Sequence, residues 1–256
     1  MLPLKLGSFT VVLSGVGVES ARGAVGWASV ALNEEHGRRT LLDCGGRADA
    51  VVLRRALERL GIAPDQIDAI VLSHLHFDHA GGLAFYPAAE IVVSEDELEH
   101  ARRSREDPWR DAAVAVAITD ELAARKARTV RDGDHVGSLT VIELPGHTPG
   151  SIGLVDRAGV LFAGDAAKNL SEVVTGISRS AVDMTRAAES ITKLRGASYT
   201  AVIPGHDRPF ACTPDTVTPL ASLRLVLRVP DVAGSQPPGD LVIDLGSGDP
   251  AYVGME

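Results

Sequence analysis

The segment Ser73–Gly82, with the sequence SHLHFDHAGG, constrains this chain most, because it holds three histidines and an aspartate within six residues. His74 and His76 are two residues apart, so on an extended segment leaving a strand both side chains point to the same side and could share one metal. Asp78 and His79 come next, where small residues allow a tight bend that could carry them toward a second metal. Imidazoles and a carboxylate without thiolate suit zinc first, with iron, manganese, nickel or cobalt as alternatives.

A catalytic zinc needs three protein ligands and an open position for water, so one short segment is not enough. Three further segments have the right character, since each is an apolar, strand-like run that ends in a glycine-flanked histidine or aspartate. They are Leu144–Ser151 with His147, Leu161–Asp165, and Val202–Asp207 with His206. Five of the eight histidines fall in these four segments, which argues against histidines scattered over a surface. Ligands on loops that follow several strands of a rigid sheet are typical of an active site.

Together the four segments resemble the metallo-beta-lactamase fold superfamily, whose pattern is a His-x-His-x-Asp-His segment followed by a His, an Asp and a His. Order, spacing and flanking glycines match over roughly residues 9 to 212. The resemblance implies an α/β fold, a four-layer αββα sandwich. It also implies a ligand set, in which His74, His76 and His147 bind a first metal, Asp78, His79 and His206 bind a second, and Asp165 bridges the two.

The chemistry implied by this resemblance is that of a hydrolase with two divalent metal ions, zinc (Zn2+) above all. With two metals about 3.5 to 4 Å apart, a bridging hydroxide attacks the carbonyl of a small ester, lactone or thioester. Asp78 would protonate the leaving group. Two alternatives stay open: a metal-dependent phosphodiesterase or nuclease that uses the same two metals, and a mononuclear iron persulfide dioxygenase on the same fold.

Within the superfamily, the motifs are most similar to those of the lactonase and glyoxalase II-like branch. Acyl-homoserine-lactone lactonases usually place a tyrosine shortly after the bridging aspartate, whereas Lys168 stands there in this chain. Lys168 is either a second catalytic residue that anchors a carbonyl or carboxylate, or a solvated side chain. We expect neither a long basic C-terminal domain like that of glyoxalase II nor the secretory signal of class B beta-lactamases.

Charge and hydropathy restrict the partners. A formal net charge of -9 argues against a nonspecific nucleic-acid binder, which needs a basic patch, so we expect a small-molecule substrate. No apolar run approaches about 18 residues and the first residues lack a signal peptide's apolar core, so we expect no membrane segment and a cytoplasmic protein. Cys44 and Cys212 are expected to be two buried thiols.

The chain is expected to form one hydrolase domain over residues 1–228. Residues 229–256 are rich in glycine and proline and are expected to pack on that domain or at an oligomer contact, with a homodimer as one arrangement. Leu241–Leu245 is expected to add a short strand or an oligomer contact there. Other expected elements are strands at Phe9–Leu13, Trp27–Leu32, Glu90–Val93, Arg128–Val130 and Leu139–Glu143, a strand pair at Ser151–Val155 and Val160–Ala163, a flexible loop at Gly15–Gly26, a turn at Asp132–Asp134, and helices at Asp49–Leu60, Ser94–Arg103 and Asp183–Arg195.

Several residues near these motifs have two interpretations. The family implies that Asp43 supports the ligand histidines, and the alternative is a local turn contact. Ser104–Lys126, with Trp109, is either an apolar wall or lid over the substrate or an ordinary surface helix. The three remaining histidines are expected to be ordinary surface or edge residues; they are His36, His100 and His135.

Overall fold

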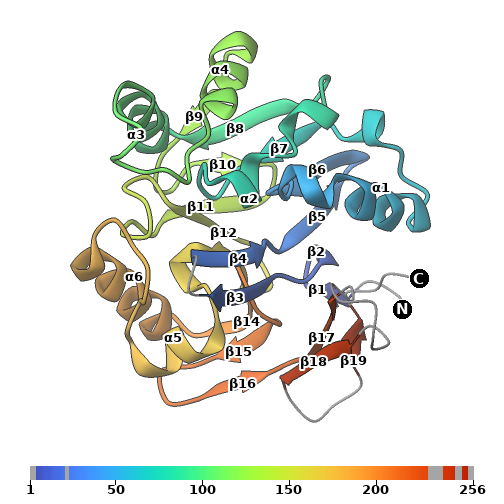
Figure 1. The fold of residues 1–256 in the computed structure, drawn as a ribbon, viewed down its shortest axis with the longest axis vertical. Coiled ribbons are helices and arrows are strands. Elements are labelled where there is room, and N and C mark those ends of the chain that lie inside the picture. Colours follow the sequence, from blue (N-terminus) through green and yellow to red (C-terminus); the bar gives the residue numbers. More distant parts are fainter. Residues whose placement is uncertain (1–3, 21–22, 230–238, 246–249, 253–256) are drawn as a thin grey trace.

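The computed structural model describes residues 4–20, 23–229, 239–245 and 250–252, and two seven-stranded sheets form its centre (Figure 1). The first sheet has the strand order β1-β2-β5-β6-β7-β8-β9. Its strands are β1 (Leu4–Leu6), β2 (Phe9–Leu13), β5 (Val30–Glu35), β6 (Arg38–Leu42), β7 (Ala69–Val71), β8 (Glu90–Ser94) and β9 (Arg128–Val130). From β1 to β6 neighbouring strands are antiparallel, and from β6 to β9 they are parallel.

The second sheet has the order β10-β11-β12-β13-β14-β15-β16. Its strands are β10 (His135–Val136), β11 (Leu139–Glu143), β12 (Ile152–Val155), β13 (Val160–Gly164), β14 (Tyr199–Pro204), β15 (Phe210–Cys212) and β16 (Val217–Pro219). The pairing of β13 with β14 is parallel, and the other pairings are antiparallel. The parallel pair matters for the site, because both strands end at the same edge of the sheet.

Helices cover the outer face of each sheet (Figure 1). Those on the first sheet are α1 (Ala50–Arg59), α3 (Glu95–Glu106) and α4 (Val116–Arg125), and those on the second are α5 (Leu170–Thr175) and α6 (Met184–Gly196). The short α2 (Phe77–Ala80) lies within the histidine-rich segment, and single 3-10 turns lie at Arg47–Asp49, Pro64–Gln66, Leu83–Phe85 and Asp165–Ala167. The four-layer αββα sandwich expected from the resemblance is confirmed.

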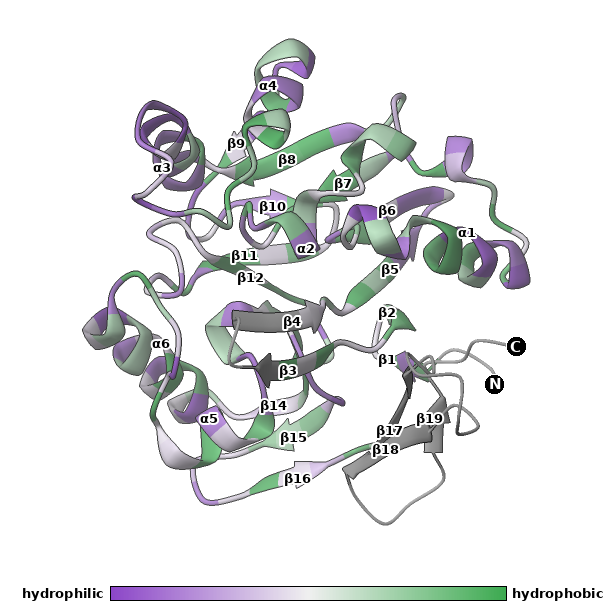
Figure 2. Cartoon of the chain, viewed as in Figure 1, coloured by the Kyte–Doolittle hydropathy of each residue, from purple (hydrophilic) through white to green (hydrophobic). Residues whose placement is uncertain are grey.

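Successive side chains of the central strands point to opposite faces of their sheet. The core therefore has three parts, one between the two sheets and one beneath the helices on each outer face. In β13, Phe162 faces the other sheet, whereas Leu161 faces α5 and α6. In β8, Val92 likewise faces the second sheet, whereas Val93 faces the helices of the first. Figure 2 shows β7 and β8 as apolar along most of their length and α3 as largely hydrophilic. Strands that are buried on both faces supply the rigid frame for the loops that follow them.

The region expected to be a flexible loop at Gly15–Gly26 is instead a hairpin of β3 (Val16–Ser20) and β4 (Gly23–Trp27). The expected strand Trp27–Leu32 was wrong at its start, because Trp27 ends β4 and β5 begins at Val30. Glycine content suggested flexibility, but here it has a steric reason. A Cβ on Gly26 would lie 3.1 Å from Cε1 of His206, closer than most side-chain contacts, so a larger residue there would have to displace that ring.

The other expected elements are found with small changes at their ends. The Asp49–Leu60 and Asp183–Arg195 helices correspond to α1 and α6, and the helix after Ser94 continues to Glu106. The expected pair around Asp156–Gly159 is the β12–β13 hairpin. Strands are present on both sides of Asp132–Asp134, but β9 and β11 belong to different sheets, so this segment crosses from one sheet to the other.

The C-terminal segment forms a three-stranded sheet of β17 (Ser222–Val229), β18 (Gly239–Leu245) and β19 (Pro250–Tyr252). The strand expected at Leu241–Leu245 is thus part of β18. Residues 230–238, 246–249 and 253–256 of the expected tail lie outside the described residues. The expected boundary after residue 228 falls within β17, and the division into domain and tail stays a prediction, as does a homodimer.

Two expectations from composition can be compared with the fold. Cys44 and Cys212 are both free and buried, as expected. Burial, together with the nearby charge of Asp43, raises the pKa of the Cys44 thiol. Among the described residues, no helix combines the length and the apolar character that a membrane crossing requires.

Candidate metal centre

The candidate ligands come from different elements and meet at one edge of the two sheets. His74 and His76 follow β7, and Asp78 and His79 lie on α2, which begins directly after His76. The others follow strands of the second sheet: His147 comes after β11, Asp165 after β13 and His206 after β14. All seven residues predicted from the sequence are therefore brought together.

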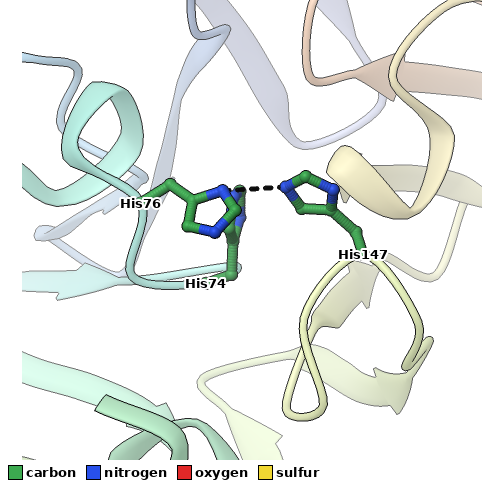
Figure 3. Close-up of side chains that lie close together, drawn as sticks. All are labelled: His74, His76 and His147. Atoms are coloured by element: carbon green, nitrogen blue, oxygen red, sulfur yellow. Dashed lines mark hydrogen bonds between the residues drawn. The ribbon is translucent and has the colours of Figure 1, made fainter. Parts of the chain in front are cut away.

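Three histidine rings form the first group, in which one nitrogen of each ring lies within 4.8 Å of the others. Figure 3 shows these rings, His74, His76 and His147, pointing toward one another from opposite sides. Nδ1 of His76 lies 2.9 Å from Nε2 of His147. Imidazole nitrogens at this spacing, from two separate loops, are suited to sharing one cation.

Asp165 lies between this group and a second group formed by Asp78, His79 and His206. Its Oδ2 is 3.2 Å from Nε2 of His147, and its Oδ1 is 3.2 Å from Nε2 of both His79 and His206. Oδ2 of Asp78 is 3.3 Å from Nε2 of His206. One carboxylate thus faces both groups, which is the geometry expected of a bridging ligand.

Three of the histidines donate one ring N–H outward, which determines their tautomers. Nδ1 of His79 donates to Oδ2 of Asp43 at 2.7 Å, and Nδ1 of His147 donates to the Ser180 carbonyl at 2.9 Å. Nδ1 of His206 donates to the Trp27 carbonyl at 3.1 Å. A neutral imidazole has one N–H, so in each ring the Nε2 that faces the cluster offers a lone pair.

The other two histidines follow the same rule. The Ser73 hydroxyl donates to Asp43, so at 3.0 Å it accepts from Nδ1 of His74. His76 is turned the other way: its Nε2 donates to Oδ2 of Asp111 at 3.0 Å, and its Nδ1 faces His147. In the neutral state, all five imidazoles therefore direct an unprotonated nitrogen into the cluster.

Two buried atoms at the centre of the cluster have no hydrogen-bond partner in the part of the chain that the structure describes. They are Nε2 of His74 and Oδ1 of Asp165. A buried polar atom without a partner costs about 1–3 kcal/mol, so such atoms usually indicate a ligand that completes them. Converging nitrogen lone pairs and carboxylate oxygens fit a divalent cation, and the donor set suits zinc.

The pKa values of the buried groups reflect the same environment. Burial lowers the pKa of His74 well below its usual value and that of His147 to about 3, which keeps both rings neutral. Burial alone would raise the pKa of Asp165, but the surrounding histidines hold it well below its usual range. Burial also acts to lower the pKa of His79 and His206, yet the neighbouring carboxylates raise both. The site therefore attracts positive charge.

Asp43 supports the site as the resemblance implied. Besides His79, its carboxylate accepts hydrogen bonds from the backbone N–H and the hydroxyl of Ser73, each at 2.7 Å. Asp43 is fully buried and has a positive φ of 58°. It connects the end of β6 to the start of the histidine-rich segment and sets the ring orientation of His79.

Asp111, which contacts His76, was missed from the sequence, and His100, which contacts Asp111, was misjudged. His100 was expected at the surface, but it is 3% exposed, and its Nε2 donates to Oδ2 of Asp111 at 2.9 Å. Asp111 was not singled out, because no local spacing relates it to His76, 35 residues earlier. His36 and His135 are exposed, as expected.

Glu97 was interpreted only as part of a helix cap. Its backbone N–H does donate to the Ser94 hydroxyl at 3.1 Å, as a capped helix requires. Its side chain, however, turns inward and accepts from the Leu75 N–H at 2.9 Å, the Thr148 hydroxyl at 2.7 Å and the Gly150 N–H at 3.1 Å. Burial raises the pKa of this carboxyl group. Glu97 thus ties together the two loops that carry the first group of histidines.

Lys168 and Trp109 differ in how they relate to the cluster. Nζ of Lys168 lies 3.8 Å from Oδ2 of Asp165, with the side chain 17% exposed, so it borders the cluster rather than extending into solvent. Trp109 is 93% exposed. Ile118 and Leu122 of α4 are buried, so α4 is an ordinary surface helix that packs one face on the core.

Comparison with known proteins places this geometry in context. A family model described as the metallo-beta-lactamase superfamily matches residues 26–206. The N-acyl homoserine lactonase AttM of Azorhizobium caulinodans is 28% identical in an alignment of 165 residues that covers 59% of this chain and 62% of that protein. The "Probable metallo-hydrolase YflN" of Bacillus subtilis is 30% identical over 247 residues, which cover 78% of this chain and 89% of that protein.

This chain matches only part of the length of several curated relatives. This chain spans between 54% and 62% of the length of three curated relatives, two of which are N-acyl homoserine lactonases. Among solved structures, the dizinc quorum-quenching lactonase AidC superposes with a TM-score of 0.61 at 18% identity, over 75% of this chain and 84% of that one. At this identity the likeness concerns the fold alone.

Proposed function

The chain belongs to the metallo-beta-lactamase superfamily, and we propose that it is a hydrolase that uses two divalent metal ions to cleave a small ester, lactone or thioester at its carbonyl carbon. The observation that carries this proposal is that each of the five histidines turns one ring nitrogen toward the cluster, while its other ring nitrogen has a hydrogen-bond partner outside the cluster. Structural histidines in a core have no reason to converge in this way.

The proposed ligand sets follow the geometric groups. His74, His76 and His147 would hold the first ion, Asp78, His79 and His206 the second, and Asp165 both. Nitrogen and oxygen donors without thiolate favour zinc, and each set of protein ligands would leave a position for a substrate or water.

Two such ions, when bound, supply Lewis acidity and make a nucleophile available from water at neutral pH. The chain supplies the proton transfer and the charge around the reaction. The side chain of Asp78 is 13% exposed, against 3% for Asp165, so Asp78 is the carboxylate that a substrate can reach. We assign it the transfer of a proton from the attacking water to the leaving oxygen or sulfur.

Lys168 is proposed as the group that binds the substrate's carbonyl oxygen or a neighbouring carboxylate. Its ammonium group already lies beside Asp165, at the partly exposed border of the cluster. A fixed positive charge at this position stabilises negative charge that develops on oxygen. The lactonase relatives make lactones the first compounds to test, and the net charge of -9 disfavours a nucleic-acid substrate.

The experiment combines metal content with turnover. Metal is measured by plasma mass spectrometry on protein purified without added metal, and hydrolysis is measured on a panel of esters, lactones, thioesters and phosphodiesters. The variant Asp165→Ala removes the shared carboxylate. His36→Ala is the matched control, because the His36 side chain is 92% exposed and contacts none of the proposed ligands.

We expect about two zinc ions per chain and turnover of an ester, lactone or thioester. Asp165→Ala should lose the bound zinc and the turnover, and His36→Ala should keep both. Turnover of the phosphodiester alone would move the function to the phosphodiesterase alternative. One iron per chain without hydrolysis would refute the hydrolase, and oxygen consumption with a persulfide would then be measured.

A further inference from the structure

Asp111 and His100 form a buried pair next to His76 that the proposed mechanism does not use. Both histidines donate Nε2–H to the same oxygen, Oδ2 of Asp111, at 3.0 Å from His76 and 2.9 Å from His100. The side chains are 11%, 9% and 2% exposed for His76, Asp111 and His100. A carboxylate that accepts two imidazole N–H groups out of water is held in one orientation.

His76 is the histidine for which such a partner matters most. The other four direct Nε2 into the cluster, whereas His76 must direct Nδ1. The tautomer with a free Nδ1 carries its proton on Nε2, and a carboxylate at 3.0 Å from Nε2 favours that tautomer. Without an acceptor there, the ring could carry its proton on the nitrogen that faces His147.

The backbone places Asp111 by a second connection. Oδ1 of Asp111 accepts the N–H of Ala113 at 3.1 Å, which closes a local turn. The Ala113 carbonyl in turn accepts the N–H of Phe77 at 2.9 Å, directly after His76. The segment before α4 is therefore attached to the histidine-rich segment through both its backbone and the Asp111 side chain.

We infer that Asp111 is a positioning residue for the first metal site, which selects the Nδ1-free tautomer of His76, and that His100 on α3 acts through it by fixing its carboxylate. This inference rests on the proposed function, since it takes His76 as a metal ligand. The segment Ser104–Lys126 would then serve the site by orienting a ligand, and not by covering the substrate.

The test measures zinc affinity by competition with a chromophoric chelator, on the full chain. Loss of the carboxylate in Asp111→Ala should weaken binding at the first site by about 10- to 100-fold, the usual effect of removing the partner of a ligand histidine. Asp111→Asn, which keeps one acceptor oxygen, should recover part of the loss. His100→Ala should weaken binding less, and should add nothing in the Asp111→Ala background, because it acts through Asp111.

Two further readouts separate positioning from folding. Nitrogen-15 NMR of the histidine rings in the zinc-free protein should show the His76 proton on Nε2 in the wild type, and a changed signal in Asp111→Ala. Asp120→Asn is the matched control, since Asp120 lies in the same segment and forms an exposed ion pair with Arg105. We expect this control to retain zinc affinity and the His76 signal.

Unchanged zinc affinity in Asp111→Ala would overturn the inference. This holds even if the zinc-free variant unfolded at a lower temperature than the zinc-free wild type, because Asp111 and His100 would then have only a structural role. A different failure belongs to the proposed function: if His76→Ala bound both metals as tightly as the wild type, His76 would not be a ligand, and both conclusions would fall.

Discussion

Asp43 makes three short hydrogen bonds with one buried carboxylate, two to Ser73 and one to His79. The backbone of Asp43 has a positive φ of 58°, a conformation that aspartate and asparagine adopt more readily than most residues. Asp43→Asn should therefore keep the backbone while removing the charge that holds the Nδ1–H of His79 outward.

We expect Asp43→Asn to weaken zinc binding by about 10- to 100-fold and to lower turnover with it. The measurement is zinc affinity by chelator competition together with ester hydrolysis. Asp68→Asn is the control, because the exposed carboxylate of Asp68 accepts only the Arg39 N–H among the contacts described. Equal zinc affinity in the two variants would show that Asp43 does not support the metal site.

Gly205 stands next to the proposed bridging ligand. A Cβ built on Gly205 would overlap Oδ1 of Asp165, one of the two central atoms without a partner. Gly205→Ala should displace Asp165, so we expect loss of metal and of activity. Gly196→Ala is the matched control, since a Cβ there meets nothing within 4 Å. Its only expected effect is an increase of up to about 1 kcal/mol in the free energy of unfolding, because alanine has the higher helix propensity. Full metal content in Gly205→Ala would refute the assignment of Asp165 as the ligand that both metals share.

At the level of secondary structure, the candidate site is held by α3 as well as by the loops that carry the proposed ligands. Glu97, in the first turn of α3, accepts hydrogen bonds from Leu75 in one ligand loop and from Thr148 and Gly150 in the other. The helix thus fixes the distance between His74 and His76 on one side and His147 on the other.

Glu97→Gln places an amide NH2 against groups that donate hydrogen bonds, so at least one of those donors loses its partner. We expect a loss of about 1–3 kcal/mol in the free energy of unfolding, measured by urea denaturation, and weaker zinc binding at the first site. Glu99→Gln on the exposed face of the same helix should change neither quantity appreciably. If both variants behaved alike, the contacts of Glu97 would not couple the two loops.

At the scale of the whole molecule, stability should come mainly from the layer between the sheets. Phe162 on β13 is completely buried there, among residues of both sheets. Phe162→Ala should lower the free energy of unfolding by about 3–5 kcal/mol. The substitution removes a buried ring and leaves a cavity that the surrounding side chains close only in part. Val51→Ala on α1, where Val51 is 60% exposed, should cost little. Denaturant unfolding of both variants checks this, and a small loss in Phe162→Ala would mean that the layer can repack.

Sequence periodicity predicted most elements because their causes are local. The apolar spacing of α1 and α6 and the turn between β12 and β13 are each contained in a short stretch of chain. The β3–β4 hairpin was missed because glycine content obscures alternation, and the reason for the glycine at 26 lies 180 residues away, at His206.

The amino-acid sequence by itself determined which residues could form the site, because ligand type and spacing are chemical properties of short segments. His74, His76, Asp78, His79, His147, Asp165 and His206 were all predicted, and the structure brings them together. Only the tertiary structure decided how each ring is oriented. Asp111, His100 and Glu97 contact residues 22 to 53 positions away or each other, and such contacts depend on how sheets and helices pack. No local pattern encodes these contacts, yet Asp111 accepts the Nε2–H of His76 and so decides which nitrogen of that ring is free to bind a metal.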